Sequence, residues 1–396
     1  MLLNNLTPIN KNQPVRVSIC GEKIEMIDAD IRRISSSDPL QINFTSATIF
    51  PGLINSHDHL DFNCFSVLGQ RKYSNYTEWG THIHKMYSKD IGTILRIPQH
   101  LRTEWGIYKN LLAGVTTVVN HGSYLKLNNP IISVLQKSQN LHSVGFEHNW
   151  KWKLNNPFLK NKDCVIHTGE GSDQQSSDEI DRLIKFNLLK RRLIGVHGVA
   201  MNANQAKYFK GLIWCPESNH ILLNKQANIL SLKEHTQMMF GTDSTLSGNW
   251  NFWHHLRLAR TLHQVTDAEL FEMITNSPAK LWNLNTGELR EGKDADLVVI
   301  KKKTGMPVWG DIYKTNPEDI LLIMTKGKIR MYDKALHVQL ISLPLNFKSF
   351  SSFSIKGNIK YIDGDLPGLV ANIKSYNPKV IFPIEVCQAG VHSGSD

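Results

Sequence analysis

The sequence predicts an α/β protein built around a (β/α)8 TIM barrel, with a small β domain beside it. Three observations predict this fold. Short apolar segments recur from residue 47 onward, and segments of helical periodicity separate most of them. Polar or catalytic-type residues follow nearly every apolar segment, as they do at the carboxyl ends of barrel strands. Near both chain ends, short strand and turn patterns replace this alternation.

Composition indicates an ordinary soluble globular protein. The chain has 396 residues, of which 41% are hydrophobic and 20% are charged. The net charge of +10 is dispersed, with tight basic clusters only at 190–192 and 301–303, and no nucleic-acid-binding motif is present. We therefore expect no nucleic-acid partner.

Cysteine usage and hydropathy suggest the compartment. The five cysteines are scattered and form no CxxC pair, which argues against a disulfide framework and favours a reducing environment. No apolar run has the length of a signal peptide core or a membrane span. We expect a cytoplasmic protein that does not associate with membranes.

The pattern divides the chain into three stretches. Strand and turn patterns such as "VRVSICGEKIEMID" and "DILLIMTKGKIRMYD" assign residues 1–48 and 290–396 to the small domain, predicted as a β-sandwich. Residues 49–289 carry the alternating pattern and form the predicted barrel. The stretch after about residue 345 gives no readable pattern.

The first barrel strand ends in the most informative motif, "IFPGLINSHDHLDFN". In an extended strand alternate side chains share a face, so His57 and His59 point the same way and Asp58 points opposite. Two imidazoles on one face suit a single metal ion. A second HxH pair, His82 and His84, follows no apolar strand, and we predict that it lies on the surface.

Later strand ends supply further ligands. His167 ends the segment "CVIH", and Asp243 follows the last strand in "MMFGTDS". Together with the HxH pair they offer three imidazole nitrogens and one carboxylate, a set that suits one divalent ion, Zn²⁺ first or Fe²⁺, with a position left for water. Glu170 and His197, also at strand ends, become candidate catalytic residues beside them.

Other side chains are candidates for contact with a substrate. Ser218 and Asn219 in "WCPESN" are expected to brace the pocket rim, and Cys215 before them to serve in packing. His121 ends the second strand, and a capped loop histidine is the equal alternative for it. The stretches "NCFSVLGQRKYSNYTEWG" and "STLSGNWNFWHH" are expected to cover the mouth of the barrel. They add candidates that could stack on or pair with a substrate, with simple packing as the equal alternative for the tryptophans: Arg71, Trp79, Trp250 and Trp253.

The order of these motifs closely resembles the amidohydrolase superfamily, in its mononuclear branch of adenosine-type deaminases, guanine deaminase, imidazolonepropionase and triazine chlorohydrolases. The motifs HxH, HxxE, strand-end His, CPxSN, GTDS and "SPAKLWNL" with "GELREGKDADLVVI" appear in the family's order between about residues 48 and 300. No lysine stands at a strand end to form the carbamylated bridge of the two-metal members, so one metal is expected.

The resemblance assigns roles position by position. It makes His57, His59, His167 and Asp243 the metal ligands. It makes Glu170 the residue that protonates a ring nitrogen or the leaving-group side of the substrate. It makes His197 the partner of the attacking water, with Asp243 transferring the proton.

One spacing departs from the family. The stretch between "HSVGFEH" and the strand leading to His167 is too short for a helix, a strand and a second helix, since one βαβ unit takes about thirty residues. We therefore expect that the fourth βα unit is eroded, or is replaced by the loop "NWKWKLNNPFLKNKD". Strand edges exposed by such a gap would favour a homodimer.

These features predict a metal-dependent hydrolase acting on a small molecule. Hydrolytic deamination of an aminated N-heterocycle is the first hypothesis. Hydrolysis of a cyclic amide or another C–N bond, or loss of another ring substituent, is the alternative. A non-catalytic binding protein on a hydrolase fold is a third reading, which the complete ligand set opposes.

Overall fold

The computed structural model divides the chain into two compact units. The terminal unit comprises residues 1–52 with 288–396, and the central unit comprises residues 53–287. The residues described are 1–9, 11, 13–29, 40–69, 71–303 and 309–386. None of the described helices has the length and apolar character needed to cross a membrane.

Both chain ends contribute strands to the terminal unit. Its described strands form one ten-stranded series, in the order β18 (Glu385–Val386), β16 (Phe350–Ile355), β17 (Asn358–Asp363), β15 (Lys328–Asp333), β14 (Ile320–Thr325), β13 (Leu297–Lys301), β4 (Gln41–Pro51), β1 (Leu2–Pro8), β2 (Val15–Cys20) and β3 (Lys23–Asp28).

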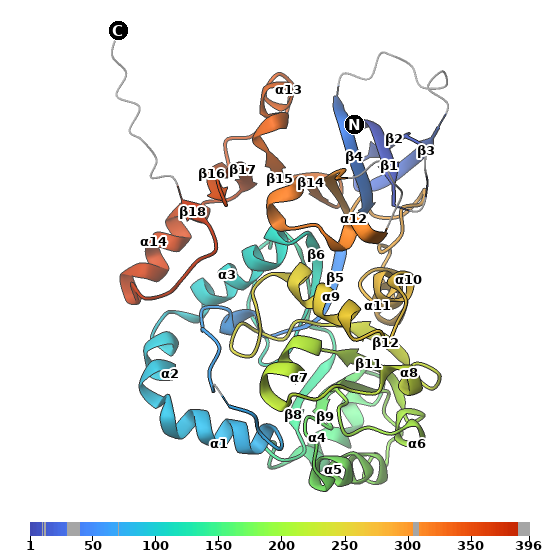
Figure 1. Ribbon diagram of the computed structural model, residues 1–396, viewed down its shortest axis with the longest axis vertical. Coiled ribbons are helices and arrows are strands. Elements are labelled where there is room, and N and C mark those ends of the chain that lie inside the picture. The colour runs from blue at the N-terminus through green and yellow to red at the C-terminus, as the bar shows by residue number, and fades with distance from the viewer. Residues whose placement is uncertain (10, 12, 30–39, 70, 304–308, 387–396) are drawn as a thin grey trace. The chain divides into compact units, whose positions relative to one another are not determined.

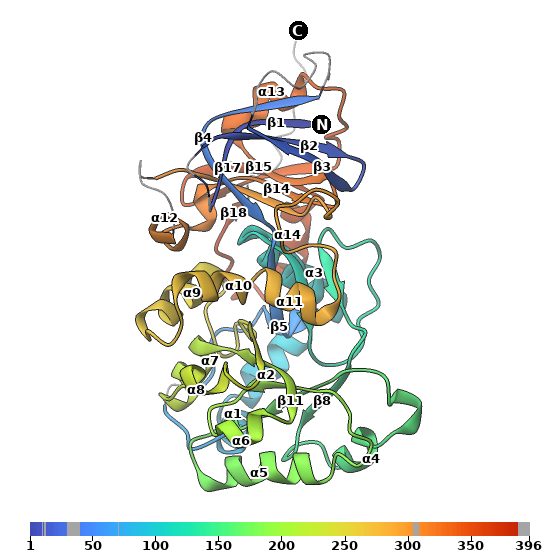
Figure 2. The ribbon, with the colours of Figure 1, turned by 90° about the vertical axis from the view of Figure 1, so that its right-hand side faces the viewer.

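This sheet is held by antiparallel ladders except for the parallel pair β1 and β4. Its core is built from inward-facing aliphatic residues such as Val17, Ile42, Val299 and Met324. Helices α12 (Trp309–Tyr313), α13 (His337–Ile341) and α14 (Leu366–Tyr376) complete the unit. The sequence predicted a β-sandwich; the described strands of this unit, drawn in Figure 2, are joined in one hydrogen-bonded series.

The central unit contains eight described strands in two parallel sheets. The first sheet has the order β5 (Leu53–Asp58), β6 (Val115–Asn120) and β7 (Ser133–Leu135). The second has the order β12 (Gln237–Phe240), β11 (Phe209–Trp214), β10 (Leu193–His197), β9 (Cys164–Thr168) and β8 (Gln139–Ser143). Every ladder within them is parallel. Strands β5, β6, β9, β10, β11 and β12 are almost entirely buried, as expected when helices cover a parallel sheet, whereas β7 and β8 are partly exposed.

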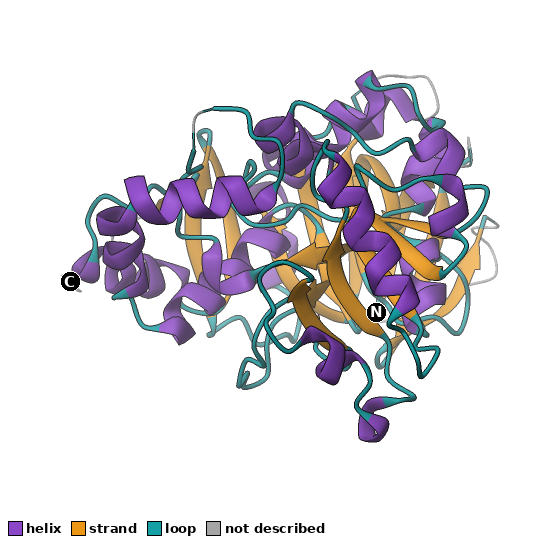
Figure 3. Ribbon diagram, turned by 90° about the horizontal axis from the view of Figure 1, so that it is seen from below, coloured by secondary structure: helices purple, strands orange, loops and turns teal. Residues whose placement is uncertain are grey.

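Helices connect most of these strands and lie outside them (Figures 1 and 3). Between β5 and β6 the chain forms α1 (Tyr76–Met86), α2 (Ser88–Leu95) and α3 (Gln99–Leu112). The later connections contain α4 (Trp150–Leu154), α5 (Gln174–Lys185), α6 (Ala203–Ala206), α7 (Pro216–Leu223) and α8 (Ile229–Leu232). After β12 come α9 (Phe252–Thr261), α10 (Asp267–Glu272) and α11 (Asn276–Trp282).

The two parallel sheets are interrupted between β7 and β8. Only residues 136–138 connect these strands, whereas a crossover between neighbouring parallel strands needs a dozen or more residues. The chain therefore cannot place β7 and β8 side by side as a parallel pair.

The predicted shortening is real, but its position was wrong. The stretch 149–163, predicted as a replacement loop, contains α4 and the short 3-10 helix Pro157–Leu159. The missing crossover helices are those after β6 and after β7. Of the segment "HSVGFEH", only His142 and Ser143 lie in a strand, because β8 ends at Ser143.

The other ends of the two sheets meet where β12 approaches β5. The backbone N–H groups of Thr242 and Asp243 both donate to the His57 carbonyl, at 3.1 and 3.0 Å. Gly241 permits this approach, because a Cβ there would lie 2.7 Å from the His57 Cβ. The carboxyl ends of the first and last strands are thereby brought together.

Two helices after β12 begin in different ways. Helix α11 begins at Asn276 with Thr275 as its N-cap, and Pro278 lies in its first turn. Proline is accommodated there because the first-turn N–H groups have no partner within the helix. Helix α10, in contrast, begins with a capping box between Thr266 and Glu269.

Candidate active site

The four predicted metal ligands converge at the carboxyl ends of the central strands. The Nε2 atom of His57 lies 3.2 Å from Nε2 of His167 and 3.9 Å from Oδ1 of Asp243. Nε2 of His59 lies 3.5 Å from the same Asp243 oxygen. The His59 and His167 rings are stacked, with centroids 5.4 Å apart.

The donor atoms form two overlapping groups that share His57. In the first, the donor atoms of His57, His59 and Asp243 all lie within 4.8 Å of one another. In the second, His57, His121 and His167 do the same. Histidine 121 is therefore a neighbour of the ligand set, and only 3% of its surface is exposed.

The protonation states favour a cation between these groups. Burial is the main cause that holds the pKa of His57 and of His167 well below the usual range, so both rings are neutral. Nδ1 of His167 lies 2.8 Å from the His142 carbonyl. Its N–H donates there, which leaves a lone pair on Nε2, a common arrangement for a histidine that binds metal.

Asp243 provides the negative charge of the set. Burial pushes its pKa upward, but His59, His197 and hydrogen bonds outweigh burial and bring the pKa below its ordinary value. Oδ2 accepts from Ser218 Oγ at 3.0 Å and from Ser247 Oγ at 2.7 Å. Oδ1 accepts from the Ser244 N–H at 2.8 Å and faces His57 and His59. Three imidazoles and one carboxylate are a donor set that fits Zn²⁺.

His197 and Glu170 lie beside this set. Nδ1 of His197 lies 2.9 Å from Asn219 Oδ1, so its N–H donates to the amide oxygen and Nε2 carries the lone pair. Nε2 lies 3.6 Å from Glu170 Oε2. Burial, and secondarily Asp243, raises the pKa of Glu170 well above its ordinary value. A neutral imidazole therefore faces a protonated carboxyl group.

Two of these residues have unusual backbone conformations. His197 has φ 72° and Asp243 has φ 58°, in the left-handed region that residues other than glycine rarely occupy. His197 is the last residue of β10, and Asp243 lies three residues beyond the end of β12. Such conformations persist only where the surrounding contacts determine them, and they concentrate at functional sites.

A cavity of about 450 Å³ opens onto the candidate centre. Of the predicted residues it is lined by His59, Trp79, His167, Glu170, His197 and Asp243. The sequence did not predict the remaining lining residues: Phe62, Tyr76, Gly80, Thr81, Ile83, His84, His142, Phe146, Ser244, Leu246 and Ser247. Helix α1 forms much of the wall, and no lysine or arginine is among the lining residues.

Four of the five predicted substrate-binding residues lie elsewhere. Arg71 pairs with Glu78 at 2.9 Å, and about half of its side chain is exposed. His121 is buried with Nε2 3.1 Å from the Leu141 carbonyl. Ser218 and Asn219 act through Asp243 and His197 rather than at the cavity wall. Only Trp79 lines the cavity, and Trp250 and Trp253 do not.

Some cavity-lining residues that were not predicted could have been recognised from the sequence. His142 lies in β8, one residue before its end, the same kind of position as the recognised histidines. His84 was assigned to the surface; it is exposed on α1, as predicted, yet it also lines the cavity. The apolar and aromatic side chains of α1 are spaced along one helix face, but no local pattern says that this face covers a cavity.

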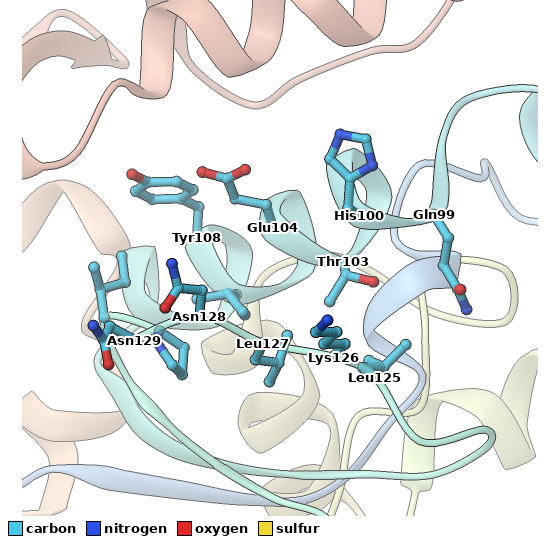
Figure 4. Close-up of a pocket in the computed structure, with 13 residues that line it drawn as sticks. Gln99, His100, Thr103, Glu104, Tyr108, Leu125, Lys126, Leu127, Asn128 and Asn129 are labelled. Atoms are coloured by element: carbon cyan, nitrogen blue, oxygen red, sulfur yellow. The ribbon is translucent and has the colours of Figure 1, made fainter.

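A second cavity, of about 550 Å³, lies between α3 and residues 125–131 (Figure 4). Its wall includes His100, Glu104 and Lys126, but none of the predicted site residues. The larger cavity is therefore not the one that adjoins the candidate centre.

Comparisons with known proteins identify relatives. The model of the amidohydrolase family matches residues 159–330. The chain is 21% identical over 397 residues to a 5-methylthioadenosine/S-adenosylhomocysteine deaminase of Pyrococcus furiosus, a match that covers 80% of this chain and 93% of the relative. It is 25% identical over 183 residues to a 5'-deoxyadenosine deaminase of Methanosphaera stadtmanae, covering 41% of this chain and 43% of that relative.

Solved structures share the fold at low sequence identity. An adenosine deaminase of Xanthomonas campestris with bound zinc has a TM-score of 0.72 at 15% identity, with 96% of this chain and 98% of that chain covered. A zinc complex of atrazine chlorohydrolase from Arthrobacter aurescens has a TM-score of 0.69 at 16% identity, with 95% and 99% covered.

Proposed function

We propose that the chain is a member of the amidohydrolase superfamily and a metal-dependent hydrolase that deaminates an N-heterocycle. The observation that supports this most is the convergence of His57, His59, His167 and Asp243 at the floor of a cavity. Zn²⁺ at this position would lower the pKa of a bound water to about 7 and so supply a nucleophile at neutral pH.

Three residues have separate roles in the proposed reaction: a base, a residue that orients the water, and an acid. Asp243 is the base, because its carboxylate is ionised and its Oδ1 faces the ligand histidines while serines hold Oδ2. His197 orients the water through Nε2, since Asn219 fixes the ring through Nδ1. Glu170 is the acid, because its raised pKa keeps a proton available for a ring nitrogen.

The two parallel sheets of the central unit are the parts of one proposed barrel. The bonds from Thr242 and Asp243 to His57 support closure at the junction of β12 and β5. The likeness to barrel-containing relatives supports the same arrangement. Active sites of such barrels lie at the carboxyl ends of the strands, where this donor set is found.

The cavity favours a flat, uncharged substrate with an apolar substituent. Phe62, Tyr76, Trp79 and Phe146 line it, and aromatic side chains pack well against planar heterocycles. A phosphate group would find no lysine or arginine among the lining residues. A purine nucleoside with an uncharged 5' substituent meets these demands. The relatives are named for 5'-deoxyadenosine and 5-methylthioadenosine, and one of them also for S-adenosylhomocysteine, whose 5' substituent carries charged groups.

The test uses purified protein with its metal content measured. Ammonia release would be followed on adenosine, 5'-deoxyadenosine, 5'-methylthioadenosine, adenosine 5'-monophosphate and an amino-triazine. We expect one stoichiometric divalent ion, turnover of the uncharged nucleosides, and at least tenfold lower kcat/KM for the monophosphate.

Two results would contradict the proposal. The absence of a stoichiometric transition metal would favour a non-catalytic protein. Ring opening of a cyclic amide without release of ammonia would support the alternative reaction, in which the same residues hydrolyse a C–N bond of the ring.

A further inference from the structure

A buried ion pair lies directly behind the candidate metal ligands. Asp58 stands between His57 and His59, and its side chain points to the opposite side of β5, toward α3. There its Oδ2 lies 2.8 Å from Nζ of Lys109. The exposed fractions of the two side chains are 0% and 2%, so both charges are removed from water.

Amide side chains complete the environment of this pair. Oδ2 of Asp58 also accepts from Asn110 Nδ2 at 2.7 Å, and Oδ1 accepts from Asn63 Nδ2 at 2.9 Å. Lys109 makes a second bond, to Oδ1 of Asn63 at 3.2 Å. The carboxylate and the ammonium group are therefore both hydrogen-bonded beyond their mutual contact.

The same network reaches the end of β12. Nδ2 of Asn55, 3.3 Å from Asp58 Oδ2, donates to Thr242 Oγ1 at 2.8 Å, and the Thr242 N–H donates back to Asn55 Oδ1 at 3.1 Å. Oδ1 of Asn63 also accepts from the Thr245 N–H at 3.2 Å. The network thus contacts residues on both sides of Asp243.

This network lies between the ends of β5 and β12, which are not paired as neighbouring strands of one sheet. The two sheets of the central unit are separate at the junction of β12 and β5, and three of the four predicted ligands come from these two strand ends. Their relative position is set by a few backbone bonds and by the side chains around Asp58.

A gain in folding stability does not by itself explain why a buried ion pair is present here. Removing two charges from water costs about as much as their attraction returns, and apolar residues of similar volume often stabilise a fold as well or better. Buried ionic groups are better explained where they fix one particular arrangement.

We propose that the Lys109–Asp58 pair is a positioning device for the metal ligands. It holds the backbone of β5 and the segment 242–245 in the register in which His57, His59 and Asp243 bind one cation. Lys109 contacts neither the cavity nor the ligands themselves, so it acts through the strand ends. This inference rests on the proposed metal-dependent function.

The test compares Lys109→Met with a matched control in the terminal unit. Lys360 is likewise fully buried and paired with a carboxylate, Asp333, at 2.9 Å. Lys360→Met also removes a buried ammonium group from a carboxylate, but in the terminal unit, which contains none of the predicted metal ligands. Zn²⁺ affinity would be measured by competition with a chromophoric chelator, and folding by circular dichroism and thermal unfolding.

We expect Lys109→Met to raise the Zn²⁺ dissociation constant roughly 10- to 100-fold, the range found for residues that orient metal ligands. Lys360→Met should stay within twofold of the wild type, even if its melting temperature falls equally. If Lys109→Met does not fold, the double variant Asp58→Asn/Lys109→Met leaves no unpaired buried charge and should show the same loss of affinity.

The outcomes separate this inference from the proposed function. Wild-type protein without stoichiometric metal contradicts the function. Wild-type protein that binds Zn²⁺, together with a folded Lys109 variant of unchanged affinity, overturns only the positioning role. Metal affinity is read without substrate, so failure to find a deaminated substrate leaves this test intact.

Discussion

Two neighbouring carboxyl groups in the site have opposite protonation tendencies. Glu170 and Asp243 are both buried, yet the pKa of Glu170 is raised and that of Asp243 is lowered. The difference follows from their partners. Asp243 accepts hydrogen bonds from two serine hydroxyls and from the Ser244 N–H, and it faces His59, whereas burial dominates at Glu170. Such a division assigns the acid and the base of a hydrolytic reaction.

Replacement of Glu170 by glutamine tests its role as the acid. The amide keeps the size and the ability to donate a hydrogen bond, but it has no transferable proton. We expect kcat to fall about 10²- to 10⁴-fold on the best nucleoside, with KM and Zn²⁺ content nearly unchanged. Steady-state kinetics and metal analysis measure this.

Asp178 on α5 supplies the control, because it is exposed to solvent and pairs only with Gln174 among its described hydrogen bonds. Asp178→Asn should retain full activity. A Glu170→Gln variant with kcat within threefold of the wild type would exclude Glu170 as the proton donor.

At the scale of elements, the contact between β12 and β5 brings the ligands together. Gly241 lies at this contact, and an added Cβ would approach His57 Cβ to 2.7 Å and His57 N to 3.0 Å. Those atoms belong to a buried strand that cannot move freely. The site therefore depends on a residue that contributes no side chain to it.

Substitution of Gly241 by alanine should separate the two strand ends. We expect a loss of about 1–3 kcal/mol in the free energy of unfolding, as for other overpacked cores. Zn²⁺ affinity should fall as well, because the His57 and Asp243 donor atoms would move apart. Urea unfolding and chelator competition measure the two effects.

Gly92 gives the comparison, because a Cβ there meets nothing within 4 Å. Gly92→Ala in α2 should be neutral or stabilising, since alanine is the better helix former. Equal behaviour of the two variants would show that the β12 and β5 contact tolerates an extra methyl group.

The sequence predicted those strands whose own residues form a recognisable pattern. Strands β9, β10 and β12 each combine an apolar run with a polar residue at the end, so His167, His197 and Asp243 could be recognised. Strand β7 is only three residues long, which is too short for any periodicity to be seen. The position of the missing crossovers therefore could not be predicted.

Local sequence patterns also could not predict which residues line the cavity. Whether Arg71 faces a substrate or Glu78, and whether His121 reaches the cavity or the Leu141 carbonyl, depends on neighbours distant in sequence. The sequence does place His121 at the end of a strand, directly after β6. It does not say which side chain that histidine faces.

At the scale of the whole molecule, the charge of the chain is not concentrated at its candidate site. The net charge is +10, yet the cavity lining contains no lysine or arginine. Instead, the central unit collects several neutral histidines in a buried cluster. Their protonation would oppose folding, which connects the site to the acid stability of the molecule.

Acid should destabilise the metal-free protein. The pKa values of His57, His121 and His167 lie well below the ordinary value, chiefly because the rings are buried. In the unfolded chain they take up protons near pH 6.5, so below this pH the unfolded state binds more protons than the folded state. The free energy of unfolding should fall progressively as the pH is lowered through 6.5.

Urea unfolding of metal-free protein at pH 7.5, 6.5 and 5.5 checks this. His121→Gln should show a shallower dependence, because one of the buried imidazoles is absent. A stability that is constant between pH 7.5 and 5.5 would mean that the cluster is already protonated or open to water in the folded state.

The division of the central unit into two sheets has a consequence for amide hydrogen exchange. His57 lies in β5 of the three-stranded sheet and His59 directly follows that strand, whereas His167 lies in β9 of the other sheet and Asp243 follows β12 by three residues. Without an ion, the three-stranded segment is free to open as a separate cooperative unit. A single cation bound by both sets would act as a crosslink, so the amides of β5 and β6 should exchange at the rate of global unfolding only in the loaded protein.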